Sequence, residues 1–342
     1  MTIQAGEPIR AAVVGAGSWG TALAQLLHRN GHRVSLWTFE EKVARQIRKE
    51  GENSTYLPGV VLSPEIQVSS DLEETVSAAE LVVSVSPAQH VGEVMGKAAP
   101  YLSEDALVVT ASKGIEIKTL RRMDEVLNPL LSPPAAERLS VISGPSFAVE
   151  VARGLPTAVV AASRSLDARL SVQAIFSSTS FRVYTNSDVL GVELGGALKN
   201  VIALAAGVSA GLDFGHNTQA ALITRGLAEI TRLGVAMGAE AATFYGLAGM
   251  GDLVLTCTGD LSRNRGVGVR LGKGEDLSDI LASMNAVVEG VRTAPAVHAL
   301  ARRYEVEMPI VDQVCAILED GKSPRAAVQD LLLRDPKPES WG

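Results

Sequence analysis

Six residues near the start of the chain constrain its fold more than any other feature. Residues 15–20, GAGSWG, fit the pattern G-x-G-x-x-G. An apolar run ends at Val14, a helical pattern covers 21–30, and a second apolar run starts at Arg33. A glycine turn that joins a buried strand to a helix is typical of chains that cradle the phosphates of a dinucleotide. The sequence therefore predicts a dinucleotide site here, with a glycine turn that binds no ligand as the alternative.

Each glycine of this turn has its own task. Gly15 permits the tight turn, and Gly17 lets the backbone approach a pyrophosphate. Gly20 lets the following helix pack closely on the strand, so that the N–H groups at the helix start face the phosphates. Gly15, Gly17 and Gly20 are therefore predicted cofactor-binding residues.

Glu40 lies at the position that decides between NAD and NADP. A carboxylate about twenty residues after the glycine turn holds the ribose hydroxyls of NAD. Glu40 is equally suited to be a helix N-terminal carboxylate favoured by the dipole, and the charged residues Glu41, Lys42 and Arg45 follow it. The predicted cofactor is NAD or NADP, and the sequence does not separate the two.

The chain changes its hydrophobic rhythm at about residue 186. Before it, apolar runs at 10–14, 33–39, 81–85, 107–111, 139–142, 157–162 and 180–184 predict strands, and segments such as 21–30, 41–49 and 89–98 predict helices. After it, a period of 3.6 predicts helices at 188–209, 217–237, 264–271, 277–284, 293–304, 310–318 and 324–333. We predict an α/β fold in which a Rossmann-like, doubly wound parallel sheet (residues 1–186) precedes an all-α domain (187–342), with the site in the cleft between them.

Composition and charge limit the binding partners and the cellular compartment that we expect for this chain. The net charge of −7 argues against a nucleic-acid or membrane-surface partner. Cys257 and Cys315 form no CxxC motif and no Cys/His cluster, which indicates a reducing compartment and predicts no metal. Residues 194–212, with Lys199 as the single charged residue, are apolar enough to raise the question of a membrane span, but their glycines, Asn200 and Ser209 favour a buried helix. The first ten residues lack the apolar core of a signal peptide, so we predict a cytoplasmic protein.

Lys199 is the strongest catalytic candidate. It lies in an apolar helical pattern, and lysines are rarely buried. Gly195 and Gly196, one turn earlier, are expected to leave open space over its face. A desolvated lysine with a lowered pKa is suited to protonate the alkoxide that forms when a ketone is reduced. The alternative is a lysine whose ammonium reaches the surface.

Polar turns elsewhere in the sequence contain residues that are suited to act together with Lys199. Arg263 offers a planar fork for phosphate oxygens between Ser262 and Asn264 at a predicted helix start, with a surface basic turn as the alternative. Asp252 follows a glycine turn and is suited to orient Lys199, to accept a substrate hydroxyl, or only to cap a helix. Lys113 follows a strand's carboxyl end, where such sheets bind ligands, and a plain loop lysine is the alternative. The Gly/Ser turn at 143–147 is a further source of backbone N–H groups.

Taken together, these motifs resemble the NAD(P)-dependent glycerol-3-phosphate dehydrogenases of the bacterial type. The resemblance runs from about residue 11 to residue 333. It rests on GAGSWGTA at 15–22, NSTYLP at 53–58, SKG at 112–114, SGPSFA at 143–148, LGGALKN at 194–200, GMGDL at 249–253, SRN at 262–264 and VVEG at 287–290. It implies a 6-phosphogluconate-dehydrogenase-like fold, reversible reduction of dihydroxyacetone phosphate to sn-glycerol 3-phosphate, a supply of glycerophospholipid precursor, and a homodimer.

The resemblance also implies roles for individual residues. Lys199 is the catalytic acid/base with Asp252 as its catalytic partner, and Lys113 contacts substrate and cofactor. The implied substrate-binding residues are Lys113, Gly144, Ser146, Lys199, Asn200, Asp252, Thr256, Ser262, Arg263 and Asn264. With the glycine turn, the implied cofactor-binding residues are Gly15, Gly17, Ser18, Trp19, Gly20, Phe39, Lys113, Ala148, Arg263, Val287 and Glu289.

The chain differs from the family pattern at two places, and two other classes of protein are alternatives. The chain has SPAQ at 86–89 where the family often has a Pro-Ser turn, and TFE at 38–40 lacks the basic or histidine residue often seen there. Phe39 is then left to stack on the adenine. A β-hydroxyacid dehydrogenase has a similar architecture and a helix lysine, but no need for the turn at 262–264. A dinucleotide-sensing regulatory protein would not need Lys199, Asp252 and Arg263 together.

Overall fold

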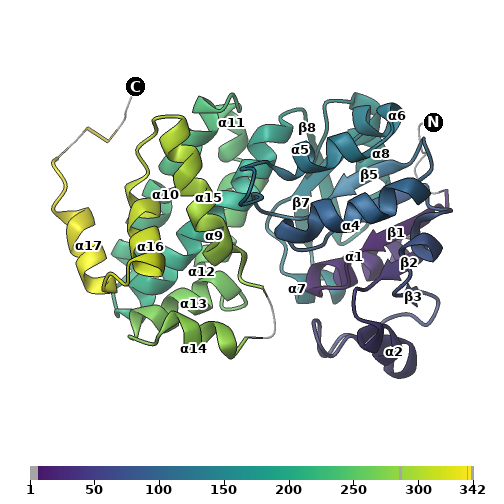
Figure 1. Cartoon of the computed structure of the whole chain (residues 1–342), viewed down its shortest axis with the longest axis horizontal. Coiled ribbons are helices and arrows are strands. Elements are labelled where there is room, and N and C mark those ends of the chain that lie inside the picture. The colour runs from purple at the N-terminus through teal and green to yellow at the C-terminus, as the bar shows by residue number, and fades with distance from the viewer. Residues whose placement is uncertain (1–6, 285–286, 337, 340–342) are drawn as a thin grey trace.

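The computed structural model describes residues 7–284, 287–336 and 338–339. Figure 1 shows two regions next to each other along the long axis of the molecule. The sheet region (residues 10–186) is drawn in purple through blue to teal, and the helical region (189–332) in teal through green to yellow. The predicted fold class, a Rossmann-like α/β sheet followed by helices, is confirmed. The division into two domains at residue 186 stays a prediction.

In the part of the chain that the structure describes, eight strands form one sheet in the order β3-β2-β1-β4-β5-β6-β7-β8. They are β1 (Arg10–Val14), β2 (Arg33–Trp37), β3 (Gln67–Ser69), β4 (Leu81–Ser84), β5 (Leu107–Thr110), β6 (Ser140–Ser143), β7 (Thr157–Ala162) and β8 (Phe181–Asn186). The strand order reverses between β1 and β4. In doubly wound sheets this switch point opens a crevice at the carboxyl ends of the strands, where ligands bind.

The sheet departs from the predicted parallel arrangement at one pair of strands. β6 pairs with β7 antiparallel, with Val141 opposite Ala162. The connection between them contains only a glycine turn and the short helix α7 (Ala148–Ala152). The chain therefore re-enters the sheet at the end where β6 leaves it, and no crossover forms. β3 was not predicted, because QVS offers one apolar residue and no periodicity.

Helices cover both faces of the sheet. Along β1, Ala11 and Val13 belong to one buried apolar cluster, and Ala12 and Val14 belong to another. This alternation is why the strand is apolar throughout. The covering elements are α1 (Ser18–Arg29), α2 (Glu41–Glu50), α3 (Leu72–Val76), η1 (Ala88–His90), α4 (Val91–Ala98), η2 (Ala99–Tyr101), α5 (Met123–Leu127), η3 (Asn128–Leu130), α6 (Pro133–Glu137), α7 and α8 (Leu166–Phe176).

The helical region is built around α9 (Val189–Gly211). This helix is long and apolar enough to cross a membrane, but 94% of its most apolar window is buried inside the protein, so it is a core helix as predicted. Around it lie α10 (His216–Ala236), α11 (Ala241–Phe244), η4 (Leu247–Gly251), α12 (Asp252–Thr258), α13 (Arg263–Gly272), α14 (Leu277–Ala282), α15 (Glu289–Arg303), α16 (Pro309–Glu319) and α17 (Pro324–Leu332).

Helices α9 and α13 approach each other backbone to backbone. A Cβ at Gly207 would lie 2.1 Å from the carbonyl oxygen of Arg265, and a Cβ at Gly268 would lie 2.1 Å from that of Leu204. No larger side chain fits between the two helices at these points. The contact fixes the start of α13 relative to the buried residues of α9.

Candidate active site

A cavity of about 880 Å³ lies between the sheet region and the helical region. This volume is near the upper end of the range of roughly 300–1,000 Å³ for ligand pockets. The sheet region contributes the glycine turn after β1 and the loop after β5. The helical region contributes residues of α9, α12 and α13.

The glycine turn forms one wall of this cavity. Gly15 has φ +128°, and a Cβ there would lie 3.0 Å from the backbone of Val85 and Ser86. A Cβ at Gly20 would lie 1.8 Å from the carbonyl oxygen of Gly15. A Cβ at Gly17, by contrast, would meet no described atom within 4 Å, and Gly17 lines the cavity. The fold thus requires the first and third glycines, whereas the second leaves this wall open for close approach.

Lys199 is buried in α9 and points its ammonium at α12. Its Nζ lies 2.8 Å from Oδ1 of Asp252 and donates to Oγ1 of Thr256 at 2.6 Å. The pKa of Lys199 is lowered to about 8, mainly because the side chain is buried. The carboxylate of Asp252 opposes this shift, and the positive charge of Lys113 adds to it. At neutral pH the group is mostly protonated, yet it can lose its proton at little cost.

Asp252 connects two lysines. It is the first residue of α12 and only 2% exposed. Its Oδ2 lies 2.6 Å from Nζ of Lys113, which also donates to the carbonyl oxygen of Gly144 at 3.0 Å. Thr256 donates its hydroxyl to the backbone oxygen of Asp252 at 2.6 Å, one helical turn back. One carboxylate thus holds a lysine from each region of the molecule.

The two glycines before Lys199 do not leave open space, and that expectation is wrong. A Cβ at Gly196 would lie 2.6 Å from Oγ of Ser143 and 3.5 Å from Cδ of Lys113. A Cβ at Gly195 would lie 2.6 Å from the carbonyl oxygen of Ala248. Neighbouring elements fill the space, because glycine lets the Lys113 stem and η4 pack directly on α9.

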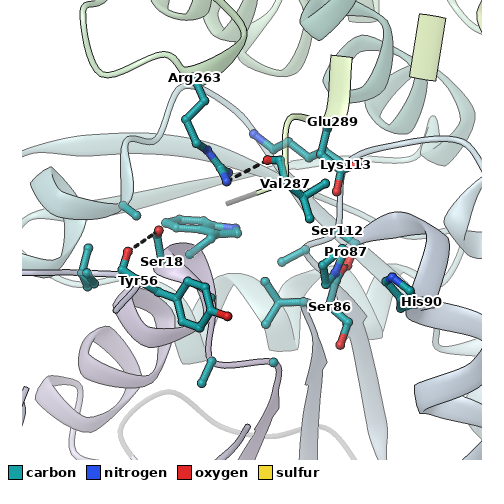
Figure 2. A pocket seen from close by; sticks show the side chains of 18 of the residues that line it. Ser18, Tyr56, Ser86, Pro87, His90, Ser112, Lys113, Arg263, Val287 and Glu289 are labelled. Carbon is teal, nitrogen blue, oxygen red and sulfur yellow. Dashed lines mark hydrogen bonds between the residues drawn. The ribbon is translucent and has the colours of Figure 1, made fainter. Parts of the chain in front are cut away.

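The start of α13 brings a guanidinium to the cavity. Nη1 of Arg263 donates to the carbonyl oxygen of Val287 at 2.9 Å, and Figure 2 shows this side chain opposite Ser18 and Tyr56. Oγ of Ser262 accepts from the backbone N–H of Arg265 at 3.2 Å and so caps the helix. The fork of Arg263 therefore faces the cavity from a rigid helix start.

Two amide side chains link α9, α13 and α15. Nδ2 of Asn264 donates to Oδ1 of Asn200 at 2.9 Å, and Oδ1 of Asn264 accepts from the backbone N–H of Gly290 at 2.9 Å. Both side chains are buried and line the cavity. These bonds orient the amides, so that they present fixed polar atoms beside Lys199 and Arg263.

Comparison with protein families identifies this arrangement. Residues 10–169 match the model of the NAD-dependent glycerol-3-phosphate dehydrogenase N-terminus, and residues 188–329 match that of the C-terminus. The chain belongs to the NAD-dependent glycerol-3-phosphate dehydrogenase family. It is 54% identical over 332 residues to the glycerol-3-phosphate dehydrogenase [NAD(P)+] of Geobacter sulfurreducens, which covers 97% of this chain and 99% of that protein.

A solved structure of this family has the same fold over nearly the whole chain. The structure of glycerol-3-phosphate dehydrogenase from Coxiella burnetii has a TM-score of 0.91 and 39% identity, covering 96% of this chain and 99% of that one. D-mandelate dehydrogenase shares only the fold, with a TM-score of 0.61, 12% identity, and coverage of 94% and 100%. The similarity to the family thus extends over nearly the whole chain, at the level of both sequence and fold.

Most site residues expected from the sequence line the one cavity. They are Gly15, Gly17, Ser18, Trp19, Phe39, Lys113, Ser146, Ala148, Lys199, Asn200, Asp252, Thr256, Ser262, Arg263, Asn264, Val287 and Glu289. Gly20 lies beneath the turn, and Gly144 takes part through its carbonyl oxygen, which accepts from Lys113. Their roles in binding and catalysis stay predictions.

The cavity fits a dinucleotide of the kind the family uses. Within the described residues, the buried atoms Nε1 of Trp19 and Oε2 of Glu289 have no hydrogen-bond partner, and both residues line the cavity. Buried polar atoms of this kind usually bond to a ligand or water. The open backbone at Gly17 adds a cradle for phosphates at the start of α1.

Sequence reasoning missed several lining residues. They are Tyr56, Ser86, Pro87, His90, Glu93, Lys97 and Ser112. The SPAQ segment at 86–89, where the chain differs from the family pattern, forms hydrogen bonds to other segments. The N–H of Ala88 donates to Oε1 of Glu289 at 3.3 Å. The side chain of Gln89 bonds to the backbone of Ile115 and Ile117. Tyr56 carried a signal, since the motif at 53–58 contains it, but no role followed from the motif.

The glycine turn yields a matched pair of variants. Gly20→Ala is expected to lower stability by about 1–3 kcal/mol, because its Cβ collides with the carbonyl oxygen of Gly15. Gly17→Ala is expected to unfold like the parent chain but to bind dinucleotide more weakly, because its Cβ enters the cradle. Thermal unfolding and NADH titration measure the two effects. Weak binding without instability in Gly20→Ala, or the reverse in Gly17→Ala, would contradict this division.

Proposed function

We propose that this chain catalyses the reversible NAD(P)-dependent reduction of dihydroxyacetone phosphate to sn-glycerol 3-phosphate. The observation that carries the proposal is the Lys199–Asp252–Lys113 cluster beside Arg263 in the cavity that the glycine turn lines. It joins a proton donor, a phosphate-binding cation and a dinucleotide cradle. The relatives named above bear the name of this activity.

Lys199 supplies the proton in this mechanism. A reduced nicotinamide, when bound, supplies a hydride. As the carbonyl carbon of the substrate accepts the hydride, the C=O electron pair moves to oxygen, and Nζ of Lys199 transfers a proton to that oxygen. In the reverse direction, neutral Lys199 removes the hydroxyl proton. A pKa of about 8 suits both directions near neutral pH.

The other residues orient the reactants. Asp252 and Thr256 hold the ammonium of Lys199 in place, and Lys113 adds positive charge where the oxygen becomes negative. Arg263 and Asn264 bind the substrate phosphate, which is remote from the reacting carbon. This remote binding energy orients the ketone toward hydride and proton.

Oxidation of NADH and NADPH in the presence of dihydroxyacetone phosphate tests the proposal. Absorbance loss that depends on this substrate supports it. Absorbance loss with β-hydroxyacid substrates instead would favour the rival dehydrogenase class. Tight dinucleotide binding without turnover of any substrate would favour a sensing protein.

Arg263 gives a prediction for substrate binding. Arg263→Ala is expected to raise KM for dihydroxyacetone phosphate about 10- to 100-fold, because charge-assisted hydrogen bonds to phosphate are lost. Arg265→Ala on the same helix is the control, since Arg265 pairs with Asp260 and does not line the cavity. Steady-state kinetics measure both variants. An unchanged KM in Arg263→Ala would contradict the phosphate assignment.

The proposed activity also suggests a metabolic role for the product. The product is the backbone precursor of glycerophospholipids, and we propose that the enzyme supplies it in the cytoplasm as a homodimer. Sedimentation at several concentrations tests the assembly. A species of twice the chain mass supports the dimer, and a single-chain mass at every concentration contradicts it.

A further inference from the structure

The end of the cavity next to β2 carries a carboxylate in a fixed position. Glu40 follows β2, is half-buried and lines the cavity. Its Oε1 accepts a hydrogen bond of 2.7 Å from the hydroxyl of Tyr56. Glu40 occupies the N-cap position of α2, but within the described residues its side chain does not bond to that helix. The carboxylate is therefore held by Tyr56 and not by the helix start.

Tyr56 is itself anchored to the glycine turn. Nδ2 of Asn53, which is fully buried, donates at 2.8 Å both to the carbonyl oxygen of Ala16 and to Oγ1 of Thr21. Oδ1 of Asn53 accepts from the backbone N–H of Tyr56 at 3.1 Å. The hydroxyl of Ser18 donates to the carbonyl oxygen of Tyr56, as Figure 2 shows. The Tyr56 ring thus has a set place relative to the phosphate cradle.

The hydroxyl of Tyr56 stays a donor over the working pH range. Burial and the neighbouring Glu40 raise the pKa of Tyr56 to about 12. The phenol therefore keeps its proton and keeps one carboxylate oxygen occupied. The other oxygen of Glu40 forms no hydrogen bond among the described residues, and it is the one left for a ligand.

Three of the cations near this end of the molecule have carboxylate partners of their own. Lys97 lines the cavity from α4, and its Nζ lies 2.6 Å from Oε1 of Glu93. On α2, Arg45 and Arg48 both pair with Glu41. A 2′-phosphate, with its charge of about −1.5 to −2, would meet the Glu40 carboxylate here. Two ribose hydroxyls would instead donate to that carboxylate.

We propose that Glu40, positioned by Tyr56, binds the hydroxyls of the adenosine ribose and makes this enzyme selective for NADH over NADPH. The inference rests on the proposed function for the class of cofactor. Glu40 is the specificity-determining residue, because it touches the ribose. Tyr56 is a positioning residue, because it acts through Glu40.

Titration of the substrate-free enzyme with NADH and with NADPH tests the proposal. The parent chain is expected to bind NADH at least about 10-fold more tightly, the value of one hydrogen bond to a charged group. Glu40→Gln is expected to bring the ratio of the two dissociation constants close to one. Tyr56→Phe is expected to lower the ratio part-way, since the carboxylate remains but is no longer oriented.

Glu50→Gln is the matched control. Glu50 is the last residue of α2, is exposed and does not line the cavity. The ratio is expected to stay at its parent value in this variant. Thermal unfolding checks that all variants fold.

Equal or tighter binding of NADPH by the parent chain would overturn the inference, as would an unchanged ratio in Glu40→Gln. Because these titrations contain no dihydroxyacetone phosphate, they are independent of turnover. Selective NADH binding without turnover of that substrate would overturn the proposed function alone. Binding of neither dinucleotide would overturn both.

Discussion

Replacing Lys199 by methionine is expected to lower kcat for ketone reduction by about 10³-fold, within the range for loss of a general acid. Methionine keeps the length and apolar stem of lysine but carries no proton to donate. Asp252 retains Lys113 at 2.6 Å, so the variant does not leave an unpaired buried carboxylate. Dinucleotide binding is expected to stay nearly unchanged. Single-turnover kinetics and NADH titration separate the two effects.

Lys118→Met is the control for this experiment. Lys118 is an exposed lysine in the connection between β5 and α5 and does not line the cavity. Its kinetics are expected to match those of the parent chain. Near-normal turnover in Lys199→Met would end the assignment of Lys199 as the acid.

The lowered pKa of Lys199 has a direction that kinetics can check. Reduction needs the protonated lysine, so its rate is expected to fall as pH rises through about 8. Oxidation of glycerol 3-phosphate needs the neutral lysine, so its rate is expected to rise through the same pH. Profiles of kcat/KM in the two directions, each scaled to its own maximum, should therefore cross near this value. Profiles that move together would exclude Lys199 as the titrating group.

The order of elements could be predicted largely from hydrophobic periodicity. The run at 10–14 coincides with β1, and the period of 3.6 after residue 186 marks α9 and α10. Such segments are long or fully apolar, so their pattern is strong. Some short elements could not be predicted: α7 spans five residues, too few for a period to appear, and α12 begins directly after the glycine turn at 249–251. The antiparallel direction of β7 could not be predicted either, because it depends on the connection from β6 and not on the residues of the strand.

The site could be predicted only as separate motifs. Lys113 and Asp252 lie 139 residues apart in sequence, and nothing in either motif states that one carboxylate oxygen serves each lysine. The glycines beside Lys199 were expected to leave space, because helix periodicity describes one helix and not its neighbours. Glu40 shows the same limit. Its partner Tyr56 lies on a different loop, and only the fold brings the two together.

Neutralising Asp252 is expected to have the second largest effect. Asp252→Asn keeps the shape of the side chain but leaves the ammonium groups of Lys199 and Lys113 without their shared carboxylate in a buried site. Removing one partner of a buried ion pair costs about 3–5 kcal/mol in stability. The protein can reduce this cost by releasing a proton, so the pKa of Lys199 should fall below about 8. Reduction at neutral pH is then expected to slow, and its pH profile to shift to lower pH.

A double variant distinguishes this electrostatic account from simple loss of packing. If repulsion between the two lysines causes the damage, Lys113→Met should partly restore stability to Asp252→Asn, since one positive charge then remains at the site instead of two. The two changes should therefore be non-additive in thermal unfolding, as expected for groups in direct contact. Additive destabilisation, with the pH profile of reduction unmoved in Asp252→Asn, would show that Asp252 contributes only packing. Recovery of stability with a shifted profile would establish that one carboxylate sets the proton affinity of Lys199 by sharing its charge with Lys113.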